Sequence, residues 1–152
     1  MLESPAYRVL SLAAHRVLSR IEIEFLHHGG KDNGKLPVTY EQFVEYGMDR
    51  ASIAPAIRET EALGFIEVTE RGCAGNADAR RPNLFRLTYR NAEGVLSDGS
   101  KEWRRIKTME EAKRIASEAR AAPSENSRQR GGKRVRRITN SISVSLPELK
   151  LH

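Results

Sequence analysis

The change of hydrophobic period at Leu63-Gly64-Phe65 constrains the fold more than any other feature of the sequence. Before this junction, apolar residues such as Ile53 and Ile57 recur at the three- and four-residue spacing of an amphipathic helix. After it, the segment FIEVTE alternates in the manner of a strand. Glycine commonly ends a helix, because it adopts the left-handed conformation without steric cost. The sequence therefore predicts a helix that passes directly into a strand, within a fold of the α+β class.

Two further helices are predicted upstream of this junction. Apolar residues recur every three or four positions over residues 7–28, and Ser4 followed by Pro5 is typical of a helix start, so we expect one long amphipathic helix there. Thr39 and Gln42 have the spacing of a capping box, which predicts a second, short helix to about residue 46. The loop between these helices ends in a short extended piece, LPV.

The start of the third helix is open to two interpretations because of Pro55. With Ser52 as the N-cap, the proline falls in the first turn, where its missing N–H has no helical partner to lose. With Asp49 as the N-cap, the proline lies deeper and would distort the beginning of the helix. In both cases the proline stiffens the N-terminal end.

The second half of the chain predicts a hairpin, a fourth helix and a tail. The alternating segment 84–90 pairs with FIEVTE across a polar tip. Thr108 and Glu111 have capping-box spacing and open a helix to about residue 121, for which Trp103 is expected to be a core anchor rather than a base-stacking residue. The predicted organisation is a domain over residues 1–90, a loop and helix over 91–122 that packs on it or dimerises, and a basic flexible tail over 123–152.

Basic charge is concentrated in the second half of the chain. Residues 1–70 contain 7 basic and 11 acidic residues, whereas residues 71–152 contain 19 and 9, within a net charge of +6. A localised basic region indicates a polyanionic partner. The single cysteine excludes a disulfide within one chain, and no apolar run has the length that a membrane span needs, so we expect a cytoplasmic protein without membrane contact.

The predicted order of elements resembles the winged helix-turn-helix domain over about residues 6–90. The resemblance is carried by TYEQFVEYGMDRASIAPAIRETEALGFIEVTERG, and above all by its LGFI junction between recognition helix and first wing strand. It is also similar to small bacterial proteins of the replication-initiation and mobile-element type. The resemblance implies three helices plus a β-hairpin wing, to which this chain adds a C-terminal helix and a basic disordered tail.

Three groups of residues are the expected DNA-binding residues. The face of the third helix that points away from Ile53 and Ile57 is small, stiff and basic at its N-terminal end, which suits entry into a major groove. Glu59 and Glu61 lie further along the helix and are expected either to avoid phosphates by position or to pair with arginines. The predicted contacts are Arg50, Ala51, Ser52, Ala54, Pro55 and Arg58 in the helix, Arg71, Asn76, Arg80 and Arg81 in the wing, and Arg128, Arg130, Lys133, Arg134, Arg136 and Arg137 in the tail.

Catalytic and metal chemistry have weak signals in this sequence. The segment 29–35 approaches the spacing of a phosphate-binding loop, but Leu36 replaces the Ser or Thr that would hold magnesium. Glu24 and His27 have the spacing of half of a metal site, and the other half is absent from the sequence. We therefore expect no enzyme activity, no metal and no cofactor.

The expected function is sequence-specific binding of double-stranded DNA by a small transcriptional regulator or mobile-element accessory factor. Two alternatives stay open: a winged-helix adaptor that binds proteins and no DNA, and a replication-initiator-like factor that binds an origin. A homodimer is also expected. The last segment, with Ile142, Val144 and Leu146 in alternation, is either a strand or a peptide that folds on another protein.

Overall fold

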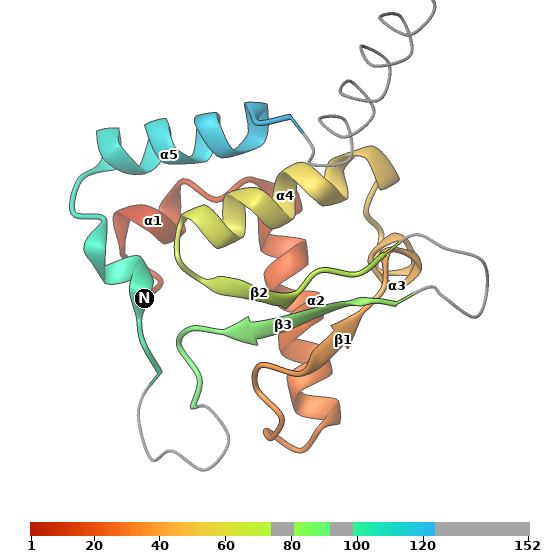
Figure 1. Cartoon of the computed structure of the whole chain (residues 1–152). Coiled ribbons are helices and arrows are strands. Elements are labelled where there is room, and N and C mark those ends of the chain that lie inside the picture. Colours follow the sequence, from red (N-terminus) through yellow and green to blue (C-terminus); the bar gives the residue numbers. More distant parts are fainter. Residues whose placement is uncertain (74–80, 92–98, 124–152) are drawn as a thin grey trace, which may run out of the picture. The chain divides into compact units, whose positions relative to one another are not determined.

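The computed structural model describes residues 1–73, 81–91 and 99–123, and these residues form an α+β fold (Figure 1). Met1–Ala122 make up one compact unit, and the unit that follows begins at Pro123. In chain order the elements are α1 (Pro5–Arg8), α2 (Leu12–His27), β1 (Leu36–Val38), α3 (Tyr40–Glu45), α4 (Arg50–Ala62), β2 (Ile66–Glu70), β3 (Asn83–Leu87), the 3-10 helix η1 (Glu102–Arg105) and α5 (Met109–Ala121).

The expectation of one long N-terminal helix is wrong, because the chain breaks into α1 and α2. Ser4 caps α1 and Pro5 occupies its first position, as the sequence indicates. A second cap, Ser11, then starts α2 by accepting a hydrogen bond from the N–H of Ala14. Glu59, 48 residues further along the chain, accepts hydrogen bonds from both the backbone N–H and the hydroxyl of Ser11. This tertiary contact fixes the point at which α2 begins.

The N-cap of helix α4 is Asp49, so the alternative with Ser52 as its cap is wrong. The Asp49 carboxylate accepts a hydrogen bond from the N–H of Ala51 at 3.0 Å. Pro55 is therefore the sixth residue of the helix and lies inside it. Because proline has no N–H, Pro55 does not donate the helical hydrogen bond that the carbonyl of Ala51 would otherwise accept. Packing of the helix, rather than its local sequence preference, stabilises it here.

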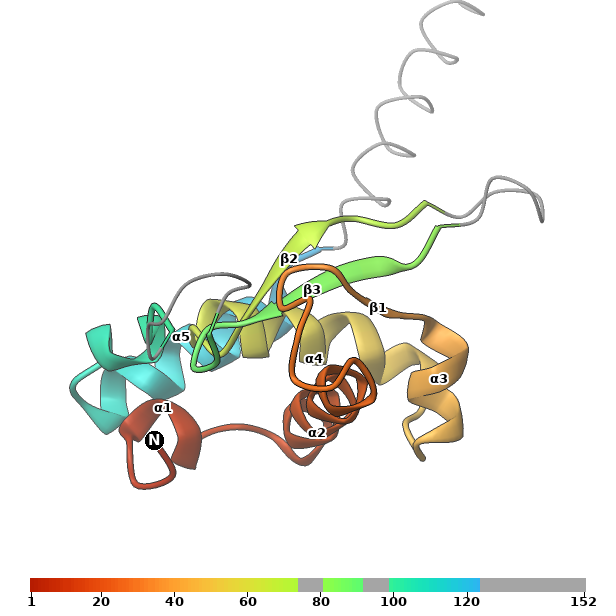
Figure 2. The same ribbon diagram turned by 90° about the horizontal axis from the view of Figure 1, so that it is seen from below.

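The three strands form one antiparallel sheet in the order β1-β3-β2. Val68 and Leu36 both lie opposite Phe85, on the two sides of the central strand. Strand β3 ends at Leu87, three residues earlier than the alternation predicts, because Thr88 and Tyr89 form a turn. Helices α2 and α4 lie on the same side of the sheet (Figure 2). The core between these layers contains Phe43, Phe65, Phe85, Ile21, Leu36, Ile53, Leu63, Ile66 and Leu87.

A buried asparagine ties the loop before β1 to the end of β3. The side-chain amide of Asn33 donates to the carbonyls of Leu87 (2.9 Å), Arg90 (3.2 Å) and Asn91 (3.0 Å). Its side-chain oxygen accepts from the N–H of Leu87 at 2.7 Å. One side chain thus supplies the donor and the acceptor that a neighbouring strand would offer.

The segment after the sheet packs back onto the helices. Trp103 stacks on Phe65 with ring centroids 6.3 Å apart, which confirms its expected role as an anchor. Gly64, with φ +80°, ends α4 in the left-handed conformation and lies against the backbone of Trp103. The cap of α5 is Thr108, as predicted, but the side chain of Glu111 returns to the N–H of Lys107 instead of completing the capping box.

Several expectations concern residues outside the described ranges. These include the tip residues Asn76 and Arg80 and the whole of the predicted tail from residue 124. Within the ranges that are described, no helix is both long and apolar enough to cross a bilayer.

Candidate nucleic-acid interface

The corner between α3 and α4 presents Arg50 at the surface. Its side chain is 64% exposed, and Nη1 lies 3.2 Å from Oε1 of Glu41 in the first turn of α3. The guanidinium also lies over the ring of Tyr40, 5.9 Å from the ring centroid. An exposed ion pair of this kind contributes about 0–1 kcal/mol to stability. Arg50 can therefore exchange Glu41 for another anion at little cost.

The other residues predicted for the start of this helix form a low surface beside Arg50. Ala51 is exposed, and Ser52, Ala54 and Pro55 are partly exposed. Ile53 and Ile57 are buried, which confirms the assignment of the two faces. Small side chains on the exposed face permit close approach of a flat or grooved ligand.

Three arginines from two separate parts of the chain act on the hydroxyl of Tyr40. Burial raises the pKa of this phenol, and the positive charges of Arg58, Arg50 and Arg71 act in the opposite direction, with burial the larger effect. Two of these arginines belong to α4, and Arg71 follows β2. Positive charges from residues predicted for the helix and for the wing therefore act on one phenol.

Arg58 has partners within the chain. Its Nε donates to the carbonyl of Ala119 at 3.0 Å, and its Nη2 donates to the carbonyl of Arg120 at 3.2 Å. Helix α5 packs along α4 with Ala112 and Ala116 buried, and the two helices run side by side in both views (Figures 1 and 2). The structure thus places the Arg58 side chain on the C-terminal end of α5.

The two acidic residues of α4 are bound within the chain. Glu59 is fully buried and accepts hydrogen bonds from Ser11 and from Nη1 of Arg120, the latter at 2.8 Å. Glu61 accepts from the N–H of Val68 at 3.1 Å and pairs with Arg71 at 3.3 Å. Of the two expectations for these carboxylates, the structure shows pairing with arginines.

The described part of the β2–β3 hairpin contains two of the four residues predicted for the wing. Arg71 lies at the end of β2, and Arg81, 74% exposed, precedes β3 and lies 3.7 Å from a carboxylate oxygen of Glu70. Gly72 donates its N–H to the side chain of Asn83 at 2.7 Å, which joins the two sides of the hairpin. This hydrogen bond fixes the part of the hairpin next to Arg71 and Arg81.

No protein family, curated protein or solved structure matches this chain.

Two residues of this surface are not predicted by sequence reasoning. Neither Tyr40, at the start of α3, nor Arg120, in the last turn of α5, is among the residues predicted to bind DNA. Tyr40 directly follows Thr39, the N-cap of the capping box, so its position at a helix N-terminus is predictable from the sequence. Nothing in the sequence near Arg120 indicates its contact with Glu59, because 61 residues separate them.

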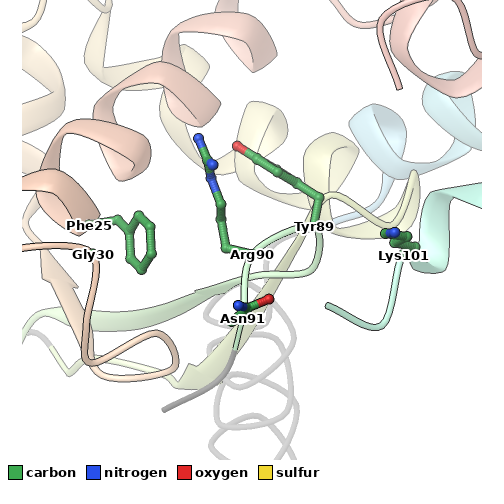
Figure 3. A pocket seen from close by; sticks show the side chains of 6 residues that line it. All are labelled: Phe25, Gly30, Tyr89, Arg90, Asn91 and Lys101. Carbon is green, nitrogen blue, oxygen red and sulfur yellow. The ribbon is translucent and has the colours of Figure 1, made fainter. Parts of the chain in front are cut away.

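A hollow lies beyond the C-terminal end of β3 (Figure 3). It has a volume of about 500 Å³ and is lined by Phe25, Gly30, Tyr89, Arg90, Asn91 and Lys101. Arg90 pairs with Glu22, and the Tyr89 hydroxyl lies 2.8 Å from the same carboxylate, so the charge of Arg90 is balanced within the chain. None of the residues predicted for DNA binding lines it. In the described ranges, no group of His, Cys, Asp or Glu side chains is arranged to hold a metal ion.

Proposed function

We propose that this chain is a sequence-specific, double-stranded DNA-binding protein of the winged-helix type. Its role would be that of a small transcriptional regulator or mobile-element accessory factor. Helix α4 enters the major groove with its N-terminal end, and the β2–β3 hairpin contacts the backbone beside it.

The observation that carries the proposal is the exposed Arg50 at the start of α4, over the ring of Tyr40 and next to the small residues of α4. A major groove about 12 Å wide admits one helix, and small side chains let its backbone approach the bases. Arginine binds guanine in a bidentate way and also binds phosphates. The same surface can therefore bind phosphates of the backbone and contact base edges in the groove.

The ion pairs of this surface are compatible with DNA binding. Arg50 and Arg81 are paired with carboxylates that are themselves about half exposed. Such pairs are weak, and a phosphate offers arginine a charge-assisted hydrogen bond of the same kind. Exchange of the carboxylate for a phosphate therefore costs little, and release of counterions from the DNA favours it.

The element order supports the winged-helix assignment. Helices α2, α3 and α4 supply the three-helix core, and a short strand, β1, joins the hairpin at β3. The exposed surface of α4 is small and basic, which favours DNA over the protein partner of an adaptor. An origin-binding factor would use the same surface on repeated sites.

A homodimer that reads two half-sites about one DNA turn apart is part of the proposal. On helix α5, Ala112 and Ala116 are buried within the chain, whereas Met109, Ile115 and Ala119 are partly exposed, so this helix stays one candidate for the contact. Leu12 and Leu26 on α2 are 71% and 62% exposed and form a second candidate. Light scattering that gives a monomer at micromolar concentration, with and without DNA, would contradict the dimer.

The proposal is tested by selecting bound fragments from genomic DNA and measuring their affinity by fluorescence anisotropy over a salt series. We expect a shared sequence among the fragments and affinity at least about 10³-fold above that for random DNA at physiological salt. Repeats of the shared sequence would indicate an origin. Absence of binding at physiological salt, or equal affinity for selected and random fragments, would refute the proposal.

A further inference from the structure

Helix α2 is apolar on two opposite faces. Its inner face is buried in the core and includes Ile21 and Phe25. On the outer face, Leu12 and Leu26 are exposed and Ile23 is partly exposed. In Figure 2, the described chain lies above and beside α2, and none of it covers the side away from the sheet. A surface helix needs only one apolar face for its own fold, so the outer face indicates contact with another molecule.

The outer face has the spacing of a helix that packs along a second helix. Leu12, Ser19 and Leu26 are seven residues apart, and Arg16 and Ile23 fall between them. These five residues, which we call the outer stripe, follow the repeat of about 3.5 residues that keeps one line of side chains facing a partner helix. Ser19 lies at the midpoint of the stripe. A small residue there lets a second helix approach closely.

The polar groups of the outer stripe and its border already have partners within the chain. The hydroxyl of Ser19 donates to the carbonyl one helical turn earlier, at 2.9 Å. The guanidinium of Arg16 donates to the carbonyl of Gly47, beyond the end of α3. Glu22, beside the stripe, accepts from the hydroxyl of Tyr89 at 2.8 Å. Because buried polar groups cost most when they have no partner, these contacts lower the cost of covering the stripe.

The charges along the outer stripe favour one orientation of a second helix. Arg16 and Glu22 lie three positions before and after Ser19. A second copy of α2 that crosses antiparallel at Ser19 therefore brings its Glu22 to the level of Arg16, and its Leu26 to the level of Leu12. A parallel copy would set Arg16 against the same arginine, and like charges in an interface are unfavourable.

We propose that the outer stripe of α2 is a dimer interface, in which a second copy of this chain binds antiparallel with Ser19 on the two-fold axis. The inference rests on the homodimer of the proposed function and names its surface. A two-fold interface uses the same patch on both subunits, so the patch must be complementary to itself. The outer stripe meets this condition, since its two ends are leucines and its midpoint is small. The partly exposed residues of α5 then lie outside the contact.

The orientation is tested by crosslinking the full chain with Cys73→Ser, which removes the exposed natural thiol. Proteins with Leu12→Cys and with Leu26→Cys, one of them carrying a mass tag, are treated with a short bismaleimide, alone and mixed. We expect several-fold more crosslinked dimer in the mixture than in either protein alone. In the antiparallel pair, the two copies of residue 12 lie about 20 Å apart, beyond the reach of the reagent. Crosslinking of Leu12→Cys mainly with itself, or of no pair at all, would overturn the inference.

The surface is tested by sedimentation equilibrium without DNA. Leu12→Glu should raise the Kd of the dimer at least about ten-fold, because it places an unpaired charge in the interface. Met109→Glu is the matched control, since Leu12 and Met109 are each the first residue of a helix, where an acidic side chain is favourable. It should leave the Kd unchanged, and circular dichroism checks the fold of both variants.

A monomeric parent at micromolar concentration, or a weaker effect of Leu12→Glu than of Met109→Glu, would overturn the inference. Neither test contains DNA, so its outcome is separate from that of the proposed DNA binding. A monomer that binds the selected DNA would refute the dimer interface and leave DNA binding intact. A dimer of the expected geometry that binds no DNA would do the reverse.

Discussion

Glu59 on α4 accepts hydrogen bonds from both the backbone N–H and the hydroxyl of Ser11, at 2.9 and 2.7 Å. Ser11 is the N-cap of α2, so a carboxylate from the middle of one helix fixes the beginning of another. The Glu59 side chain is inaccessible to solvent, and Arg120 balances its charge. The Glu59 carboxylate therefore links α2, α4 and α5 at one buried point.

Glu59→Ala should lower the free energy of unfolding by about 3–5 kcal/mol, because it leaves the Ser11 groups and Arg120 without their acceptor. Glu118→Ala is the matched control, since Glu118 is 63% exposed and pairs with Arg114 on the same helix. Its cost should be below about 1 kcal/mol. Denaturant titration followed by circular dichroism measures both, and equal costs would show that the buried carboxylate has no special role.

Arg50→Ala should weaken binding to the selected site by about 1–3 kcal/mol and weaken binding to random DNA less, because a base-reading arginine discriminates between sequences. Arg105→Ala removes a similarly exposed arginine from η1, away from the proposed surface, and should change neither affinity appreciably. Anisotropy titrations on both DNAs make the comparison. Equal losses on selected and random DNA would assign Arg50 to phosphates.

Gly64→Ala should destabilise the fold by about 2–5 kcal/mol, from the left-handed backbone and from overpacking together. A Cβ here would lie 2.7 Å from the backbone nitrogen of Trp103 and 2.8 Å from the carbonyl carbon of Glu102. Gly29→Ala is the control, because Gly29 has φ +64° and no atom within 4 Å of an added Cβ. Only the conformational cost of about 1–2 kcal/mol applies there. Thermal melts with similar losses for both variants would contradict the steric argument.

The imidazole of His28 should titrate above its usual pKa of 6.5. The hydrogen bond with Asp32, at 2.9 Å, is the main cause, and the charges of Asp32 and Glu24 add to it. A raised folded-state pKa means that this contribution to stability is complete below about pH 6.5 and is lost as the pH rises through the folded-state pKa. NMR titration should give a lower pKa for His28 in Asp32→Asn, and an unchanged value would exclude the hydrogen bond as the cause.

Truncation after Ala122 removes all six tail residues predicted to bind DNA, namely Arg128, Arg130, Lys133, Arg134, Arg136 and Arg137. Each phosphate that the tail no longer neutralises should lower the magnitude of the log–log salt slope by roughly 0.9 and leave the preference for the selected site unchanged. An unchanged slope would exclude DNA as the ligand of the tail and favour a protein partner. A changed preference would mean that the tail reads a groove.

Local signals in the sequence predicted most of the individual elements. The capping box of Thr39 and Gln42 forms as expected, and Gly47 and Gly64 end their helices with positive φ. Each of these signals acts within a few residues, so it does not depend on the rest of the fold. The alternating segments likewise predicted the hairpin of β2 and β3.

Long-range contacts explain what the sequence did not predict. The break between α1 and α2 depends on Glu59, which is 48 residues from Ser11. The contacts of Arg58 with the end of α5 span more than 60 residues, so the sequence alone assigns this arginine, on an exposed helical face, only to DNA. Periodicity shows which face of a helix is polar, but it does not show which polar groups the chain itself will bind.

The contacts of Asn33 bear on the order in which the chain can fold. Its partners lie 54 to 58 positions later, at and beyond the end of β3. The three-residue strand β1 also pairs with β3, so neither the loop nor this strand has its hydrogen-bond partners while the first half of the chain stands alone. Closing such long loops is entropically costly and slows folding. During synthesis, the buried amide of Asn33 in the acidic first half therefore lacks its hydrogen-bond partners until residue 91 has been made. A fragment that ends before residue 91 should not fold.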